Sequence, residues 1–217
     1  MYAPKAFEEA DPATLGSLVA AHPLGTWVVW HGDGPVANHV PFQLDADRGP
    51  HGTLVGHVAR ANPVWQGLDG GARSRSLVVF QGAQGYVTPS WYASKREHGK
   101  VVPTWNYAVV HAHGLALAIE DRERLLAIVR GLTEVHEAGR AHPWAVEDAP
   151  SDFTAQLLEA IVGIEIPLDR LVGKWKMSQN RPEADRLGVA AGLVADAPAD
   201  PQALAHAALV RAVRQPR

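Results

Sequence analysis

The stretch LGTWVVWHGDGPVANHVPFQL, residues 24–44, carries the pattern on which the fold prediction depends. Residues 24–31 and 36–44 are rich in β-branched and aromatic residues, as strands are, and GDGP (32–35) between them predicts a tight turn. Strands joined by so short a turn run antiparallel, because a parallel pair needs a long crossover connection. The stretch therefore predicts a β-hairpin.

More strands follow the hairpin on short connections. They are predicted at residues 53–59, 74–82, 85–89, 106–119 with a bend at Gly114, and 162–177. A doubly wound sheet would alternate strand and helix, whereas here the strands are consecutive and most helices come late. The order therefore favours an antiparallel barrel.

Helices are expected at the edges of this barrel. Asp11 and Pro12 begin the first, Asn62 and Pro63 begin a short one that contains Trp65, and Asp121 caps the longest, which Gly139 ends. Further helices are predicted at 151–161, at 182–193 and after a linker at 195–202. We expect one domain over residues 1–194, and a C-terminal linker and helix over 195–217.

Composition excludes several classes of protein. The 217 residues include no cysteine, which rules out disulfides, thiolate zinc sites and cysteine nucleophiles. The net charge of −3 is unlike that of a protein that depends on non-specific affinity for nucleic acid. The chain has no apolar run of membrane-spanning length, and MYAPKAFEEADP lacks the order of a signal peptide. We expect a cytoplasmic protein with no membrane partner.

Two stretches combine residues that suit a ligand. In GHVARANPVW (56–65), Arg60 and the helix opened by Asn62 suit a phosphate, although Asn62 could serve only as a cap and Arg60 could be solvated. In residues 86–107, five large rings alternate with hydrogen-bonding side chains: Tyr86, Trp91, Tyr92, Trp105 and Tyr107 with Ser90, Lys95, Thr104 and Asn106. This mixture suits a planar heteroaromatic ligand, and the alternative is a surface loop held by its rings.

The run KWKMSQNR (174–181) ends a predicted strand with four consecutive hydrogen-bonding side chains, which suggests a ligand. His111 and His113 lie two residues apart on one strand face and could hold a metal or haem iron, or be a half-buried pair with no ligand. The sequence has no phosphate-binding glycine loop and no serine–histidine–acid pattern, so no side chain is predicted to be catalytic. A cofactor that carries the chemistry would fit this pattern.

Seven blocks in order resemble the PaiB family of FMN-binding negative transcriptional regulators: MYAPKAF, NHVPFQLD, GHVARANPVW, GYVTPSWYASK, VPTWNY, VHAHG and KWKMSQNR followed by DRLGVAAGL. The resemblance covers roughly residues 1–193. It implies a mainly β fold with peripheral helices, a six-stranded antiparallel Greek-key split β-barrel of the FMN-binding type. It also implies a homodimer with FMN at the subunit interface.

The resemblance assigns the candidate residues to FMN. The phosphate would be held by Arg60 and Asn62, with His39 one strand earlier. The isoalloxazine ring would lie against Trp91 and Trp105, with Ser90, Lys95, Thr104 and Asn106 at its polar edge. The C-terminal run would reach the flavin, from the partner subunit, through Lys176, Ser178, Gln179, Asn180 and Arg181.

For function, the resemblance implies a repressor that acts on DNA or through a partner regulatory protein. No helix-turn-helix stands out, although two C-terminal helices could present Arg181, Arg186, Arg211 and Arg214 to DNA, or could instead cover the barrel or the dimer seam. A rival interpretation is an FMN-dependent oxidoreductase or flavin reductase. A third is a haem-binding split-barrel protein that uses His111 or His113.

Overall fold

The computed structural model describes residues 1–31, 34–71 and 73–213. The predicted turn at 32–35 includes residues 32 and 33, which lie outside the described residues, as does Arg214. The strands are β1 (Glu8–Glu9), β2 (Leu24–His31), β3 (Gly34–Pro41), β4 (Gln43–Asp45), β5 (Thr53–Ala59), β6 (Ser74–Val87), β7 (Thr104–Ile119) and β8 (Ile161–Lys176). The α-helices are α1 (Pro12–Ala21), α2 (Ser94–Glu97), α3 (Arg122–Glu137), α4 (Ser151–Glu159), α5 (Glu183–Asp196) and α6 (Pro201–Ala212). Four short 3₁₀ helices connect them: η1 (Lys5–Phe7), η2 (Pro63–Gly71), η3 (Pro89–Trp91) and η4 (Val146–Asp148).

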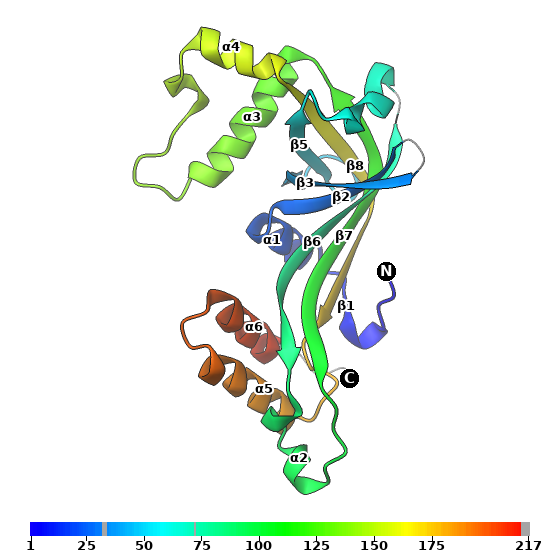
Figure 1. The fold of residues 1–217 in the computed structure, drawn as a ribbon, viewed down its shortest axis with the longest axis vertical. Coiled ribbons are helices and arrows are strands. Elements are labelled where there is room, and N and C mark those ends of the chain that lie inside the picture. Colours follow the sequence, from blue (N-terminus) through cyan, green and yellow to red (C-terminus); the bar gives the residue numbers. More distant parts are fainter. Residues whose placement is uncertain (32–33, 72, 214–217) are drawn as a thin grey trace. The chain divides into compact units, whose positions relative to one another are not determined.

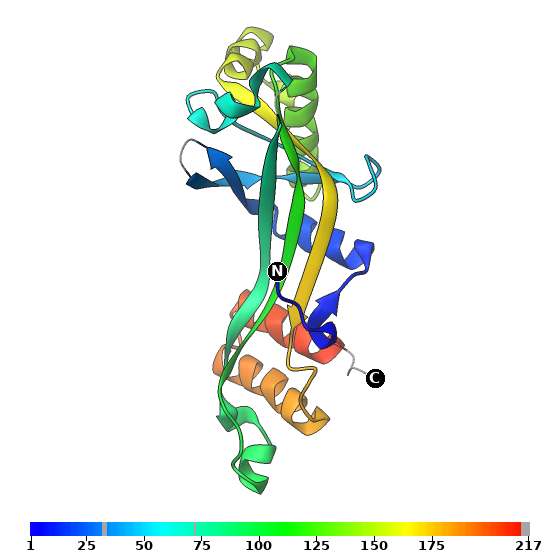
Figure 2. The ribbon, with the colours of Figure 1, turned by 90° about the vertical axis from the view of Figure 1, so that its right-hand side faces the viewer.

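The strands form one sheet in the order β3-β2-β6-β7-β8-β5-β4, and β1 pairs with β8 (Figure 1). The pairs β2–β3, β2–β6, β4–β5, β5–β8 and β1–β8 are antiparallel. Figure 2 shows the long strands β6, β7 and β8 next to one another, in that order. The prediction of a mainly β, antiparallel fold with peripheral helices is confirmed.

The predicted count of six strands is not confirmed, because the described residues form eight strands and no pairing among them joins β3 to β4 to close the sheet. The strand expected over 36–44 is interrupted at Phe42, whose backbone N–H donates to the carbonyl of Pro23 at 2.9 Å. The strands expected at 74–82 and 85–89 are one strand, β6. Every second residue of β6 is buried as far as Gly82. Gly82 and Ala83 are both buried, so beyond this point the opposite face of the strand is the buried one.

Two helix caps expected from the sequence are present. Asp11 accepts a hydrogen bond from the N–H of Thr14 at 2.9 Å, at the start of α1. Asp121 accepts one from the N–H of Arg124 at 2.9 Å, at the start of α3. Within the described part of the chain, no helix is long and apolar enough to cross a bilayer.

The chain divides into two compact units. Unit 1 contains residues 1–18, 81–110 and 172–217, and unit 2 contains residues 19–80 and 111–171. The predicted domain boundary after residue 194 falls within α5, in unit 1.

Unit 2 has a core of strand residues with α3 against it. Trp27 is fully buried, and its indole N–H donates to Ser76 Oγ at 3.0 Å. The rings of Phe42 and Phe80 meet edge to face, with centroids 6.5 Å apart, a favourable geometry for an aromatic pair. Helix α3 approaches β8 closely, since a Cβ on Gly163 would meet the side chains of Ile128 and Leu125.

In unit 1, α5 and α6 pack together and their buried side chains contribute to a second core. Val189 on α5 and Val210 on α6 are fully buried. Two glycines of α5, Gly188 and Gly192, allow Trp91 to approach the helix, because a Cβ at either position would collide with Trp91.

Candidate functional site

The predicted phosphate residue Arg60 is already engaged in unit 2. Its guanidinium donates to the Glu120 carboxylate at 2.7 Å and to the carbonyl oxygens of Glu159 at 2.8 Å and Ile161 at 3.1 Å. It also lies over the Trp65 ring, 5.5 Å from the centroid. These contacts tie the end of β5 to the start of β8. A phosphate at Arg60 would have to share the guanidinium with Glu120.

Asn62 acts as a cap, the alternative left open by the sequence. Its Oδ1 accepts the N–H of Val64 at 3.1 Å, and its Nδ2 donates to Asn38 Oδ1 at 2.8 Å. His39 is exposed and lies on the opposite face of β3 from Asn38, because successive strand residues alternate. Unit 2 therefore brings Asn62 to Asn38 rather than to His39.

Most of the other predicted residues lie in unit 1, where the start of β7 is close to the end of β8. Lys176 Nζ donates to Thr104 Oγ1 and, at 2.9 Å, to the carbonyl oxygen of Trp105. Burial lowers the pKa of the Lys176 ammonium, and the positive charges of Lys174 and Arg181 add to this effect. Lys176 is half-buried, so part of its side chain remains open to solvent.

Asn106, Ser178 and Gln179 are buried and satisfy one another or their own backbone. Asn106 Nδ2 donates to Ser178 Oγ at 3.0 Å. Gln179 Oε1 accepts the N–H of Met177 at 2.7 Å, and its Nε2 donates to the carbonyl oxygen of Trp175. Ser178 has φ of 63°, a left-handed backbone that is uncommon outside glycine. These contacts account, without a ligand, for Ser178 and Gln179, two of the four consecutive polar side chains at 178–181.

The remaining predicted residues form separate small contacts. Lys95 Nζ donates to Ser90 Oγ at 3.0 Å on the exposed surface. Trp91 packs on α5, as described above, and Asn180 is exposed. The guanidinium of Arg181 lies over the Tyr92 ring at 4.9 Å.

One face of the unit 1 sheet gathers aromatic and polar side chains. We call it the aromatic face and define it by Gln84, Tyr86, Trp105, Tyr107 and Lys176. Trp105 is 49% exposed and Tyr86 52% exposed; the indole N–H of Trp105 donates to Gln84 Oε1 at 3.0 Å. Gly85, between Gln84 and Tyr86, points the other way, toward α6. The aromatic face therefore lies opposite α6.

Sequence reasoning missed part of this face. Gln84 was not singled out, and Tyr86 and Tyr107 were noted as rings but not as ligand contacts. The period of two in β6 and β7 was the available signal, because it places Gln84 with Tyr86 and Trp105 with Tyr107. The sequence alone did not show which strands are neighbours.

The two histidines lie in unit 2. The ring centroids of His111 and His113 are 6.2 Å apart, and burial lowers the pKa of each imidazole. Among the described residues no group of three or more His, Cys, Asp or Glu is placed to hold a metal. His113 lines a cleft of about 530 Å³ with Trp30, Ser76 and Arg170, and its Nε2 is buried without a hydrogen-bond partner in the described structure.

Arg186 and Arg211, two of the C-terminal arginines within the described residues, differ in exposure. Arg186 has a side chain only 11% exposed, and its Nη1 donates to the carbonyl oxygens of Val210, Arg211 and Val213 at 3.0–3.1 Å. It therefore caps the end of α6 from α5. Arg211 is exposed, whereas Arg186 is nearly buried. Both interpretations of the two helices, presentation to DNA and cover of the barrel or the dimer seam, stay predictions.

Comparison with known proteins identifies the class. The family described as "Putative FMN-binding domain" matches residues 1–170, so the chain belongs to this FMN-binding domain family. The Bacillus subtilis "Protease synthase and sporulation protein PAI 2" is 32% identical over 189 residues, covering 87% of each chain. The resemblance to the PaiB family is thereby confirmed. An uncharacterised Emericella nidulans protein is 33% identical over 225 residues, covering 88% of this chain and 90% of that one.

Among solved structures, the "FAD and Heme binding protein from Mycobacterium smegmatis" is similar with a TM-score of 0.58. The match covers 78% of this chain and 73% of that chain at 18% identity. At this identity the likeness shows the fold alone.

Proposed function

We propose that this chain is a PaiB-type flavoprotein that binds FMN at the aromatic face of unit 1. The observation that carries the proposal is the half-exposed indole of Trp105 on a strand to which Lys176 is anchored, through the backbone carbonyl of Trp105 and the hydroxyl of Thr104, in a chain of the FMN-binding domain family. The choice of FMN over other flavins belongs to this proposal.

The residues of this face suit an isoalloxazine ring. Trp105 and Tyr86 offer flat apolar surface, while Lys176 has one N–H donor beyond those it gives to Thr104 and Trp105, which can reach a ring oxygen or nitrogen. Bound flavin would supply hydride or electron transfer, and a nearby cation would stabilise negative charge on its reduced ring. Arg60, Asn62 and His39 stay sequence-based candidates for the phosphate, although in unit 2 Arg60 pairs with Glu120 and Asn62 serves as a cap.

An absorbance spectrum of the purified protein tests the proposal first. We expect a flavin double band, with FMN released by heating and identified by chromatography. In a fluorescence titration, Lys176→Met should weaken FMN binding about 10- to 150-fold, since it removes one charge-assisted hydrogen bond. Lys5→Met removes an exposed lysine of unit 1 and serves as the control. A colourless protein that does not bind added FMN would overturn the proposal, and unchanged affinity in Lys176→Met would remove that residue from the site.

We further propose that the protein is a cytoplasmic homodimer and a negative regulator of transcription. The regulatory role is supported by the relationship to the Bacillus subtilis protein, which is named "Protease synthase and sporulation protein PAI 2". The net charge of −3 favours regulation through a partner protein over a broad DNA-binding surface, and so does Arg186, which donates its hydrogen bonds within the chain. Retardation of a specific promoter fragment by the purified protein alone would favour direct DNA binding.

An FMN-dependent reductase is the rival, because a flavin that lies on the exposed rings of Trp105 and Tyr86 would keep its outer face open to a second substrate. Sustained NAD(P)H oxidation by the flavin-loaded protein would favour the reductase. Its absence, together with promoter control that changes on flavin reduction, would favour the regulator.

Haem binding has one supporting observation, the His113 cleft with its unpartnered Nε2. A Soret band on addition of haemin, lost in His113→Ala but not in the exposed variant His39→Ala, would support it. The absence of a Soret band would rule out haem binding.

A further inference from the structure

A cleft in unit 2 lies beside α3, and none of the residues assigned above to FMN is among its lining residues. Its volume is about 550 Å³, within the range typical of small-molecule sites. One wall comes from β4 and the loop after it, another from the first turns of α3, and β5 and β8 contribute the floor: Leu44, Asp45, Arg48, Val55, Arg124, Ile128 and Glu165 are among the lining residues.

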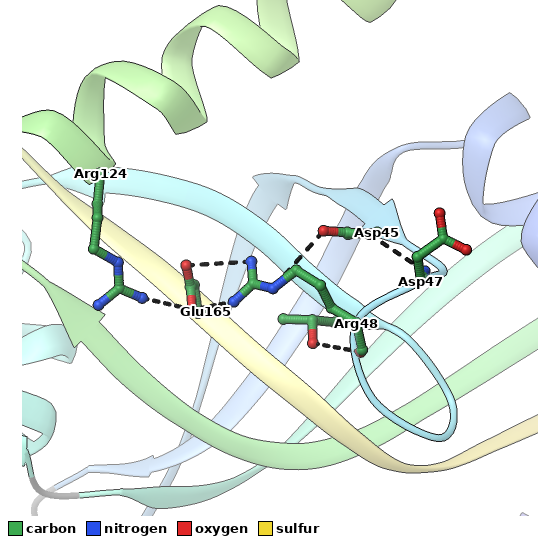
Figure 3. A network of polar contacts seen from close by, with 6 residues as sticks. Asp45, Asp47, Arg48, Arg124 and Glu165 are labelled. Atoms are coloured by element: carbon green, nitrogen blue, oxygen red, sulfur yellow. Dashed lines mark hydrogen bonds and ion pairs between the residues drawn. The ribbon is translucent and has the colours of Figure 1, made fainter.

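A buried carboxylate holds two arginines in this cleft (Figure 3). The Glu165 side chain is 7% exposed, and its Oε2 lies 2.9 Å from Arg48 Nη2 and 2.9 Å from Arg124 Nη2. The arginine side chains are 46% and 51% exposed. Burial alone would raise the pKa of Glu165, but hydrogen bonds from Arg48 and Arg124 outweigh this and lower it. The two guanidinium groups are therefore fixed in direction, which reduces the entropy lost on binding a ligand.

Arg48 and Arg124 differ in the number of acidic groups with which they pair. Arg48 has a second acidic neighbour, Asp45, with Nε 3.8 Å from Oδ2. Arg124 makes its one described ion pair with Glu165, through Nη2. Its remaining N–H donors make no hydrogen bond among the described residues, and about half of its side chain is exposed at the cleft. Arg124 is thus the better placed of the two to accept an anion.

Part of the cleft lining is apolar. Val55 on β5 and Ile128 on α3 belong to a small buried cluster with Ile119 and Leu132. Leu44 of β4 adds a partly exposed apolar side chain to the lining. A ligand that reaches Arg124 can therefore cover apolar surface with the rest of its structure, which is favourable at about 25 cal/mol per Å².

We propose that this cleft binds a small carboxylic acid with an apolar body, its carboxylate paired with Arg124 and Arg48 and its body against Val55, Ile128 and Leu44. A monoanion suits the site better than a phosphate, because Glu165 and Asp45 already balance the two arginines and Asp47 adds a negative charge at the rim. A planar carboxylate also matches the forked geometry of a guanidinium.

The test uses the full-length protein, as purified, and 3-phenylpropionate as the probe. A titration followed by amide chemical shifts should show saturable binding with a Kd of about 1 mM, a typical affinity for so small a ligand. Shifts should concentrate on α3, β4 and β5. The neutral amide 3-phenylpropanamide and the variant Arg124→Gln should each bind about 10- to 150-fold more weakly, because each lacks the charge-assisted pair.

Arg130→Gln is the matched control, since Arg130 lies on the same helix, is 47% exposed and pairs with Glu147 outside the cleft. It should bind the acid as the wild type does. Equal binding of the acid and the amide, equal binding by Arg124→Gln, or no saturable binding of the acid would each overturn the proposal. The FMN titration is independent of these results, because none of the cleft residues is assigned to the flavin.

Discussion

His206 should make this protein less stable in mildly acidic solution. The side chain lies on α6 in unit 1 with an exposed fraction of 0%, and neither ring nitrogen has a hydrogen-bond partner in the described structure. Its Nδ1 lies 3.0 Å from the position that a Cβ on Gly85 would take, so β6 closes over the ring. Burial lowers the pKa of His206 from 6.5 to about 4.

The lowered pKa of His206 decides whether stability rises or falls with pH. Between about pH 6.5 and pH 4 the unfolded chain binds a proton at His206 and the folded chain does not, so stability falls as the pH falls. The difference between 6.5 and about 4 corresponds to about 3.4 kcal/mol, at about 1.36 kcal/mol per pH unit. This loss is complete below the folded pKa and absent above about pH 7.5.

The variant His206→Leu removes the titrating group while keeping an apolar side chain of similar size. Its free energy of unfolding in urea, relative to wild type at the same protein concentration, should rise by about 3 kcal/mol between about pH 7.5 and pH 4. His142→Leu, at an exposed loop position, is the control and should show no such trend. A difference between His206→Leu and wild type that is constant with pH to within about 1 kcal/mol would refute the argument.

Two further substitutions test the packing of each unit. Arg186→Met removes hydrogen bonds to three carbonyls at the end of α6 and should lower the free energy of unfolding by about 1.5–3 kcal/mol. Amide exchange in the last turn of α6 should accelerate. The exposed control Arg211→Met should change neither the stability nor the exchange rate. Gly114→Ala would place a Cβ against the backbone carbonyl of Pro167 on β8, and should cost about 1–3 kcal/mol by overpacking. Gly139→Ala, where a Cβ meets nothing within 4 Å, should be near neutral in the same urea titration.

Much of the secondary structure could be predicted because local signals agreed with the tertiary environment. Residues 24–31 and 53–59 match β2 and β5 in full, and Asp11 and Asp121 cap their helices as expected. The errors were in strand boundaries. The strands predicted at 74–82 and 85–89 are one strand, in which Gly82 sits where the buried face changes and Gly85 makes room for His206. The strand predicted at 36–44 is interrupted at Phe42.

The candidate sites were harder to predict because strand pairing decides which side chains meet. Glu165 meets Arg48, 117 residues earlier in the chain, through the pairing of β5 with β8. Within the sequence Glu165 is only a polar residue between Ile164 and Ile166, and nothing local indicates two cationic partners. The same limit applies to the aromatic face, where Trp105 meets Gln84 across neighbouring strands.

The polar run at 174–181 suggested a ligand, but only some of its side chains still have hydrogen-bonding groups for one. Buried polar groups require partners, and the chain itself supplies them for Ser178 through Asn106 and for Gln179 through its own backbone. Those two residues can shape a site but have few donors left for a ligand. Lys176 differs, because it is half-buried, holds its position through Thr104, and carries a charge at the edge of the aromatic face. If the run takes part in flavin binding, Lys176 is therefore the residue whose loss should affect affinity most, and substitution of Ser178 should act mainly on stability.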